Sequence, residues 1–461
     1  MKLYRILASL SRDESRFYCY IQVRIEKRIV LSAKKIAKVV SRWWRQADAA
    51  EQHHIPRGAH SLSRQQLSSS VLKVLYRLHK SGFEAYLVGG GVRDLLLNRV
   101  SKDFDVATNA TPDEIRGLFV NSRIIGRRFQ IVHVVFHEET IEVSTFRAAE
   151  QQDDKPQSKI QFENTFGCLE EDVWRRDFTV NALYYNISDF SILDYAGGMA
   201  DLAQKKVKMI GDPILRFKED PVRLLRAIRF VAKLNFNMEK KTEEGVNTLS
   251  ELLRQVPGSR LLHEFEKMFL SGYAAVTFKA LESYDYLKLL FPELPAILVK
   301  KNKAARKLLN FGLENTDKRY SQQLSLSAGF FLSVMLWPVF VARLHDEEDQ
   351  YSHFYSALHG SIQQTIQQQQ AILSIPKRHS AMMRSVWVLQ FNLERRRPKR
   401  VKSLLRHRYF RAAMDLLELR AKVDKELLSL ARWWRTLEDS DAESVADLIS
   451  ALHGSNDRNK K

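Results

Sequence analysis

The sequence predicts an α/β head followed by an all-α neck, body and tail. In the first half of the chain, short strand-like segments alternate with short helical segments, a pattern typical of an α/β module, which we expect to end near residue 215. Beyond Asp220 the strand signals fade, and long helical patterns, broken at prolines, run to about residue 455. The predicted strands of the head lie near 84–88, 102–106, 131–136 and 140–145, and its short helices near 92–97 and 112–119.

Composition divides the chain into regions in the same order. A chain of 461 residues is too long for one ordinary core, so several domains are expected. In the head, Thr111-Pro112-Asp113-Glu114 predicts a helix start, because a capping hydroxyl precedes a proline and two acids. The predicted regions are a basic N-terminal extension (1–50), a polar linker (51–67), the head (68–215), a helical neck (216–275), a helical body with a basic arm (276–455) and a basic tail (456–461).

The basic extension contains one amphipathic pattern. From Arg24 to Arg45, apolar residues recur at helical spacing, and lysines and arginines fill the opposite face. A basic amphipathic helix can bind RNA or an anionic membrane surface, so peripheral membrane contact is one expectation for this segment. Docking on the protein's own body, or a start codon assigned too far upstream, fits the pattern equally well.

Charge and cysteine content indicate the class of partner and the compartment. The chain has 73 basic and 54 acidic side chains, a formal net charge of +19. This excess predicts a polyanionic partner, most often nucleic acid, although a generically basic surface is the alternative. Cys19 and Cys168 are the only cysteines, which excludes a disulfide framework or a cysteine-rich zinc site and fits a cytoplasmic protein. The sequence has no apolar run of about eighteen residues, so we expect no membrane-spanning helix.

The most informative segment is YLVGGGVRDLLLNRVSKDFD, residues 86–105. Its triple glycine, Gly89 to Gly91, joins a strand to a helix, and a helix N-terminus favours anions such as phosphate. Asp103 and Asp105 lie two residues apart in a predicted strand, so both carboxylates project from one face. Carboxylates so close are both ionised only beside a cation, and Mg²⁺ prefers oxygen ligands shared with substrate phosphates. We therefore expect a phosphate site and a magnesium site close together.

Glu142 is a candidate third metal ligand. It lies within the strand-like segment Thr140-Ile141-Glu142-Val143-Ser144, in which Ile141 and Val143 would face the core. Glu142 then faces either the metal site or ordinary solvent, and the pattern fits both interpretations.

The segment WRRDFTVNAL, residues 174–183, suits nucleotide contacts. Arg176 and Asp177 are candidates for contacts with a triphosphate and a ribose, because the arginine fork matches phosphate oxygens. Such a cluster is also common on the surface of a helix, which is the alternative for these residues taken alone.

The segment EDPVRLLRAIRF, residues 219–230, has a second charged pattern. Asp220 and Arg223 are three residues apart and share a helix face that Arg226 continues. An aspartate beside an arginine offers both acceptors and donors, which reading the edge of a base requires. A solvated basic helix is the alternative.

The densest basic run, RRRPKR at residues 395–400, lies in the helical body. Phosphate contacts made by such a run give affinity for RNA without sequence preference and weaken steeply with salt. A solvated basic face is the alternative. The candidate RNA-binding residues are Arg396, Arg397, Lys399 and Arg400, continued by Arg406, Arg408 and Arg411.

Four motifs in this order resemble the class II nucleotidyltransferases of the polymerase β superfamily. They are Gly-Gly-x-Val-Arg-Asp, Asp-x-Asp, Arg-Arg-Asp-Phe-Thr-x-Asn and Glu-Asp-x-x-Arg, within roughly residues 68–270. The resemblance implies a nucleotidyltransferase head with a polymerase β-like sheet, and two-metal chemistry with Mg²⁺. It implies Asp103 and Asp105 as magnesium ligands and Asp177 as a further active-site acid. It also assigns phosphate support to Gly89, Gly90 and Arg93, sugar or phosphate contacts to Arg176 and Asp177, and base contacts to Asp220, Arg223 and Arg226.

Within this family the chain is more similar to the bacterial poly(A) polymerases than to the CCA-adding enzymes. Residues 126–134 (GRRFQIVHV) resemble the polymerase version of that segment, and residues 330–435 resemble its helical body. This resemblance implies template-independent transfer of AMP from ATP to RNA 3′ ends, serving RNA turnover, with RNA-decay machinery as an implied partner. A CCA-adding enzyme is the alternative within the class, and a catalytically inactive RNA-binding protein is the alternative outside it. The intact acids at 103, 105 and 177 argue against the inactive protein.

Overall fold

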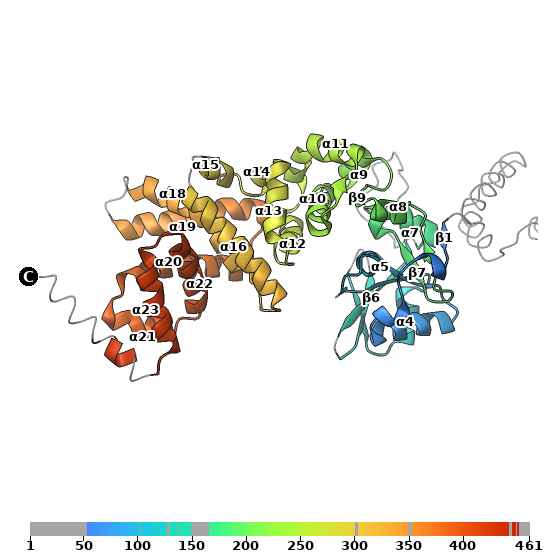
Figure 1. Ribbon diagram of the computed structural model, residues 1–461, viewed down its shortest axis with the longest axis horizontal. Coiled ribbons are helices and arrows are strands. Elements are labelled where there is room, and N and C mark those ends of the chain that lie inside the picture. The colour runs from blue at the N-terminus through green and yellow to red at the C-terminus, as the bar shows by residue number, and fades with distance from the viewer. Residues whose placement is uncertain are drawn as a thin grey trace, which may run out of the picture. The chain divides into compact units, whose positions relative to one another are not determined.

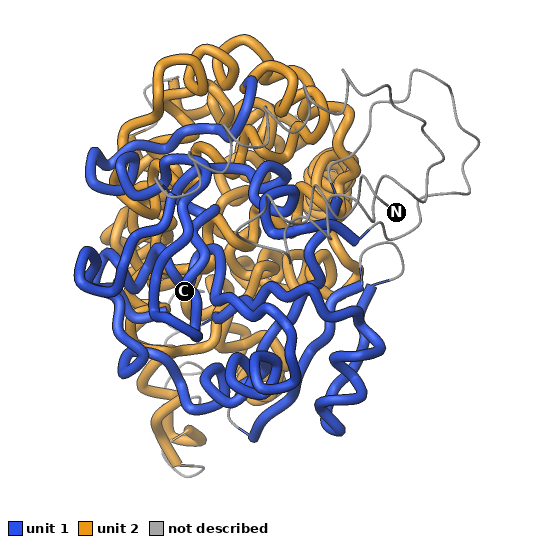
Figure 2. The backbone as a smooth tube through the Cα atoms, turned by 90° about the vertical axis from the view of Figure 1, so that its right-hand side faces the viewer, with its two compact units in different colours: residues 1–212 blue, residues 213–461 orange. Residues whose placement is uncertain are grey.

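A computed structural model describes residues 53–101, 103–126, 130–137, 139–148, 166–299, 303–348, 353–441, 445–448 and 450 (Figure 1). The amphipathic extension and the basic tail expected from the sequence lie outside these residues, as does part of the segment 126–134. The chain divides into two compact units, residues 1–212 and 213–461, which Figure 2 shows in different colours.

The first unit is built on a mixed eight-stranded sheet in the order β1-β8-β7-β2-β3-β6-β5-β4. β3 and β6 are parallel to one another, and the other pairs with a described register are antiparallel. The strands are β1 (His54–Ile55), β2 (Ala85–Val88), β3 (Asp105–Thr108), β4 (Ser122–Ile125), β5 (Ile131–Val135), β6 (Thr140–Thr145), β7 (Tyr184–Asn186) and β8 (Ile192–Leu193).

Helices pack on both faces of this sheet. They are α4 (Ser69–Lys80), α5 (Gly90–Leu96), α6 (Pro112–Leu118) and α7 (Leu169–Arg175). α4, α5 and α6 share one core with Leu87, Val106 and Val143, whereas α7 packs with Tyr86 and Ala107 in a second core. Because successive side chains of a strand point to opposite faces, the two cores lie on opposite sides of the sheet. The α7 face carries exposed side chains on β6 and β4, so this face stays accessible beyond α7.

The start of α6 agrees with the sequence prediction. The Thr111 hydroxyl accepts a hydrogen bond from the Glu114 amide, and the Glu114 carboxylate accepts one from the Thr111 amide at 2.7 Å. This reciprocal capping satisfies donors that the first turn of the helix would otherwise leave unpaired. The strand predicted over 102–106 begins later, at Asp105, so Asp103 precedes β3.

In the residues that the structure describes, the second unit is helical, as predicted, apart from the short strand β10 (Asn237–Met238). Pro257 and Pro376 immediately precede α12 and α20, which agrees with the expectation that prolines break the helical patterns. The elements are α9 (Pro213–Glu219), α10 (Val222–Leu234), α11 (Lys240–Thr248), η4 (Ser250–Gln255), α12 (Gly258–Phe269), α13 (Ala274–Ser283), α14 (Leu287–Leu290), α15 (Leu294–Val299), α16 (Lys303–Ser321), α17 (Ala328–Met335), α18 (Trp337–Glu348), α19 (Phe354–Leu373), α20 (Lys377–Arg395), α21 (Pro398–Leu405), α22 (Phe410–Val423) and α23 (Leu427–Asp439).

Two tryptophans mark the cores of this unit. Trp387 on α20 stacks on Phe340 with ring centroids 4.8 Å apart, and its indole N–H donates to the Ser333 carbonyl. Trp434 on α23 is buried among residues of α20, α21 and α22. Within the described residues, no single helix is long and apolar enough to cross a membrane; α17 and α18, bent by 50°, reach the required length and apolarity only as a pair.

Candidate active site

The glycine turn after β2 lies next to one acidic and one basic side chain of the predicted site. Gly89 has φ 72° and ψ −137°, a conformation that side-chain-bearing residues rarely adopt. A Cβ atom at Gly89 would lie 3.5 Å from Oδ2 of Asp105 and 3.6 Å from Nη1 of Arg176. The bare backbone of this turn therefore lies between a carboxylate and a guanidinium, where a phosphate and its counter-ion could both be held.

Three polar side chains align across the open face of the sheet. Asp105 on β3 is in register with Glu142 on β6, and Glu142 is in register with His133 on β5. Residues in register on adjacent strands share a face, and His133 Nε2 lies 3.4 Å from Oε1 of Glu142. The structure thus places Glu142 beside Asp105, while its role as a metal ligand stays a prediction.

Asp103 lies two residues before Asp105, outside the strand. Phe104 is buried in the core on the opposite face, whereas Asp103 is exposed and Asp105 is half-buried. Asp105 therefore projects to the open face, and a position of the Asp103 carboxylate beside it stays a prediction because Asp103 lies outside the strand. In the part of the chain that the structure describes, no group of three or more His, Cys, Asp or Glu side chains is arranged to hold a metal ion. The donor set is nonetheless one that Mg²⁺ prefers, because accessible carboxylate oxygens lie beside a glycine turn.

Arg176 is held in place by two buried partners that the sequence prediction missed. Its Nε donates to the Tyr184 hydroxyl at 2.6 Å, and its Nη2 donates to the Asp172 carboxylate at 3.0 Å. Tyr184 donates in turn to Asp172 at 2.6 Å. Burial disfavours the charge of Arg176, but Tyr184 and Asp172 outweigh it and raise the pKa of the guanidinium. Burial raises the pKa of the Tyr184 hydroxyl, which therefore stays protonated and donates.

Arg93 and Asp177 lie in the interior beneath the glycine turn. Arg93 is only 2% exposed; it pairs with Asp94 at 2.7 Å and donates to the Asn181 side chain at 2.5 Å. The Asn181 amide donates to Asp177, whose carboxylate also accepts the Phe178 amide at 2.8 Å. These contacts give Arg93 and Asp177 a supporting position, and a direct contact of either with substrate stays a prediction.

The candidate base-contacting residues at the start of the second unit have side-chain partners within that unit. Asp220 precedes α10 and pairs with Arg260 at 3.0 Å, while Arg223 pairs with Glu219 at 3.0 Å. Asp220 lies before the first turn of α10, where Arg260 on α12 reaches it, so it does not share a helix face with Arg223 as expected. Contacts of Asp220, Arg223 and Arg226 with a base stay a prediction. Arg226 is half-buried, with its guanidinium 5.7 Å from the Phe230 ring.

The predicted RNA-binding residues are all exposed. Arg396, Arg397, Lys399 and Arg400 lie where α20 ends and α21 begins. Aromatic rings accompany this run: Arg396 lies 5.9 Å from the Trp433 ring, and Arg395 lies 5.0 Å from the Tyr355 ring. Basic side chains interleaved with aromatic rings suit single-stranded nucleic acid.

The mixed sheet with its glycine turn and paired aspartates, followed by a helical unit, defines a nucleotidyltransferase. Family models match in three segments, described as "Poly A polymerase head domain" (85–208), "Probable RNA and SrmB-binding site of polymerase A" (235–298) and "Polymerase A arginine-rich C-terminus" (350–461). Poly(A) polymerase I of Salmonella typhimurium is 41% identical over 86% of this chain and 88% of its own length. The chain belongs to the bacterial poly(A) polymerase family.

Sequence similarity to CCA-adding enzymes covers a smaller part of the chain, whereas similarity in fold covers most of it. A CCA-adding enzyme of Lactobacillus helveticus is 40% identical, but over only 45% of this chain and 51% of its own length. The crystal structure of the Bacillus stearothermophilus CCA-adding enzyme in complex with CTP aligns over 86% of this chain and all of that one. Its TM-score of 0.54 at 20% identity shows a shared fold and agrees with the predicted head and helical body.

Proposed function

We propose that this chain is a polynucleotide adenylyltransferase that adds AMP from ATP to the 3′-hydroxyl of RNA without a template. The observation that carries the proposal is the arrangement of Asp105, Gly89 and Arg176 in the head of a chain with poly(A) polymerase sequence over most of its length. A carboxylate and a fixed guanidinium on either side of a bare backbone turn suit a metal-bound triphosphate.

Asp103 and Asp105, with Glu142 beside them, would hold Mg²⁺, which when bound lowers the pKa of the RNA 3′-hydroxyl and neutralises the triphosphate. Gly89 lets the phosphates approach the backbone, and Arg176, oriented by Tyr184, contacts their oxygens. The 3′ oxygen forms a bond to the α-phosphorus as the bond from that phosphorus to the bridging oxygen breaks, and pyrophosphate leaves. The protein contributes chiefly positioning and charge stabilisation.

The other parts of the proposal concern the base, the RNA and the cellular setting. Asp220, Arg223 and Arg226 contact the adenine, and the basic run 395–400 holds the RNA strand. The reaction takes place in the cytoplasm, a proposal that rests on the low cysteine content. It serves RNA turnover together with RNA-decay machinery, a proposal that rests on the family. Peripheral membrane contact rests on the basic pattern of the extension.

The decisive experiment is incubation of the full chain with Mg²⁺, a generic RNA and each nucleoside triphosphate separately, followed by sizing of the products. A ladder of repeated additions with ATP alone is the expected result. A halt after addition of CCA from CTP and ATP would establish the tRNA nucleotidyltransferase alternative. Absence of addition under every condition would support the alternative of a catalytically inactive RNA-binding protein.

Replacing the paired acids tests the metal assignment. We expect Asp103→Ala and Asp105→Ala each to lower AMP addition by roughly 10²-fold or more, because charge stabilisation of the transition state is lost. The melting temperature should change little, since neither carboxylate belongs to a core. Asp113→Ala, at an exposed acid on α6, is the matched control. Extension at the wild-type rate by either variant would refute the assignment.

A further inference from the structure

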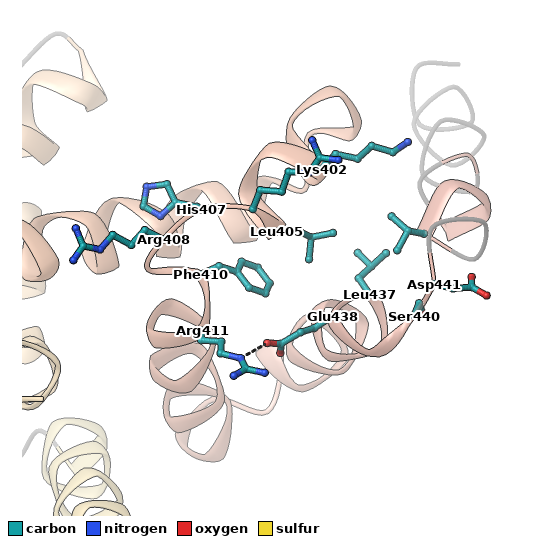
Figure 3. A pocket seen from close by; sticks show the side chains of 12 residues that line it. Lys402, Leu405, His407, Arg408, Phe410, Arg411, Leu437, Glu438, Ser440 and Asp441 are labelled. Carbon is teal, nitrogen blue, oxygen red and sulfur yellow. Dashed lines mark hydrogen bonds and ion pairs between the residues drawn. The ribbon is translucent and has the colours of Figure 1, made fainter. Parts of the chain in front are cut away.

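The helices α21, α22 and α23 of the second unit line an open pocket of about 520 Å³ (Figure 3). α21, α22 and α23 line it, together with the turn between α21 and α22 and the residues that follow α23. Its apolar lining is Leu405, Phe410, Leu437 and Val445, and its basic lining is Lys402, Arg406, Arg408 and Arg411. Ligand pockets of this size combine an apolar surface with a few convergent polar groups, which is the composition found here.

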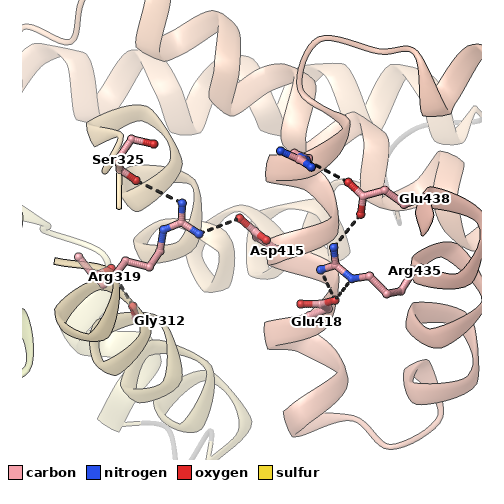
Figure 4. A network of polar contacts seen from close by, with 9 residues as sticks. Gly312, Arg319, Ser325, Asp415, Glu418, Arg435 and Glu438 are labelled. Atoms are coloured by element: carbon pink, nitrogen blue, oxygen red, sulfur yellow. Dashed lines mark hydrogen bonds and ion pairs between the residues drawn. The ribbon is translucent and has the colours of Figure 1, made fainter. Parts of the chain in front are cut away.

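The charges of the lining are arranged to accept an anion. Lys402 and Arg406 are exposed on one side of the pocket. On the other side Arg411, whose side chain is 89% exposed, donates through Nε to Glu438 at 3.1 Å. Glu438 also accepts a hydrogen bond from Arg435 at 2.7 Å, and Arg435 is tied to Glu418 (Figure 4). Arg411 can therefore turn to a ligand phosphate while Glu438 keeps a cationic partner.

The composition of the pocket selects a nucleotide over a bare anion. Phe410 and Leu437 form the almost fully buried floor of the pocket, and half-buried Leu405 provides the apolar surface that stays accessible beside them (Figure 3). A phosphate alone would leave this surface unused, whereas a base would cover it. Single-stranded RNA presents unstacked bases that can leave the strand and enter such a pocket. The basic run at Lys399 and Arg400 lies on the same helix, α21, as Lys402 and Leu405, so one RNA strand is long enough to contact both the run and the pocket.

We propose that this pocket takes one nucleotide of the acceptor RNA, with its base on the apolar surface and its flanking phosphates on Lys402, Arg406 and Arg411. The proposal rests on the proposed function, since it names a subsite for the RNA strand that the enzyme extends. The helical arm then contacts a base as well as the RNA backbone, so its affinity for RNA depends on the presence of that base.

Filling the pocket tests the base. Leu405→Trp occupies the apolar surface and keeps every charge. We expect it to weaken binding of a 3′-deoxy-terminated oligo(A) RNA to the full chain by about tenfold in fluorescence anisotropy, the scale of one lost base contact. Binding of an abasic ribose-phosphate strand of the same length should not change. Ser440→Trp fills the pocket from α23's side and repeats the test if Leu405→Trp melts early. Wild-type affinity for oligo(A) in both variants would overturn the proposal.

Removing the cations tests the phosphates. Lys402→Ala and Arg406→Ala should each lower the slope of log affinity against log salt by about 0.7, the value for one single-strand phosphate contact. Lys425→Ala, at an exposed lysine between α22 and α23 that does not line the pocket, is the matched control. Slopes equal to that of the control would place the strand elsewhere and contradict the proposal.

AMP addition measured on the same proteins separates this proposal from the proposed function. Wild-type protein that extends RNA while Leu405→Trp binds oligo(A) normally refutes the pocket alone. Wild-type protein that binds RNA but never adds AMP refutes the proposed function alone.

Discussion

Two adjacent tyrosines of β7 have opposite chemical roles. Tyr184 is hydrogen-bonded to Arg176 and Asp172, whereas the buried hydroxyl of Tyr185 has no hydrogen-bond partner among the described residues and faces the other core. Because residues next to each other on a strand face opposite sides, the same side chain supports the candidate site at one position and only fills space at the next. The pair therefore provides a test with its own control.

Tyr184→Phe should lower kcat/KM for ATP by about tenfold, since hydrogen bonds to charged groups are worth roughly 1.5–3 kcal/mol and this one orients Arg176. The loss should fall mainly on KM if Arg176 binds the triphosphate equally in the ground state and the transition state. Steady-state kinetics with ATP and a fixed RNA measure this split. Tyr185→Phe is the control and should leave the kinetics unchanged. Equal effects of the two variants would show that Tyr184 serves packing alone.

At the scale of single elements, the sequence predicted the start of a helix or strand correctly where residues close in the sequence determine it. The start of α6 depends on a capping hydroxyl, a proline and an acid within four residues, and it lies where predicted. The start of β3 depends instead on pairing, because Val88 and Glu142 are the partners of Asp105 on its two sides. The prediction therefore began that strand three residues too early.

Contacts of the site that were not predicted from the sequence also depend mainly on residues distant along the chain. Asp220 was expected on one helix face with Arg223, but it precedes the helix, and its partner Arg260 lies forty residues away. Asp172, four residues before Arg176 on one helix, was within reach of a spacing argument. Tyr184 was not, because nothing in an apolar strand distinguishes its hydroxyl from that of Tyr185. The acids and glycines of the site could be predicted because they lie close together in the sequence.

Thr111 provides a test of the predicted helix start. Thr111→Ala should lower the free energy of unfolding of the head by about 1 kcal/mol, because the Glu114 amide loses its capping hydroxyl. Chemical denaturation followed by circular dichroism measures the change. Thr111→Ser keeps the hydroxyl and should retain the wild-type stability. A loss in the serine variant as large as that in the alanine variant would assign the effect to the methyl group instead of the cap.

Asp415 on α22 gives the second unit a pH-dependent contact with α16. Burial raises the pKa of this carboxyl above its ordinary value of 3.8, an effect that Arg319, 3.8 Å away, only partly opposes (Figure 4). The folded state then binds the proton more tightly than the unfolded state. The carboxylate consequently costs stability above its folded pKa, and this cost disappears as pH falls below 3.8.

Asp415→Asn should therefore raise the melting temperature of the protein relative to wild type near pH 7. The difference should shrink as pH falls through the folded pKa towards 3.8, where the wild-type carboxyl is protonated and resembles the amide. Thermal unfolding across this pH range provides the measurement. Asp439→Asn, at an exposed aspartate of α23, is the control and should show little difference at any pH. A gain for Asp415→Asn that is the same at every pH would rule out the carboxyl's titration as its source.

At the scale of the whole molecule, the net charge of +19 raises the question of whether the RNA is held by a site or by a general field. A field attracts any polyanion and depends on total charge, so equal charge changes anywhere on the surface should act equally. A site depends on which cations contact phosphates. The exposed pairs Lys399–Arg400 on α21 and Lys205–Lys206 in the head have the same charge and separate these two cases.

Reversal of Lys399 and Arg400 to glutamate changes the net charge by as much as reversal of Lys205 and Lys206. If the strand contacts α21, the first variant should raise the apparent RNA KM by about tenfold at ~0.1 M salt, because two phosphate contacts become repulsive. It should also flatten the dependence of KM on salt, while the head variant changes both only slightly. AMP addition at a series of RNA and salt concentrations provides both quantities. Equal shifts in the two variants would mean that the field dominates, and a KM that keeps its wild-type salt dependence in the α21 variant would remove this helix from the path of the RNA.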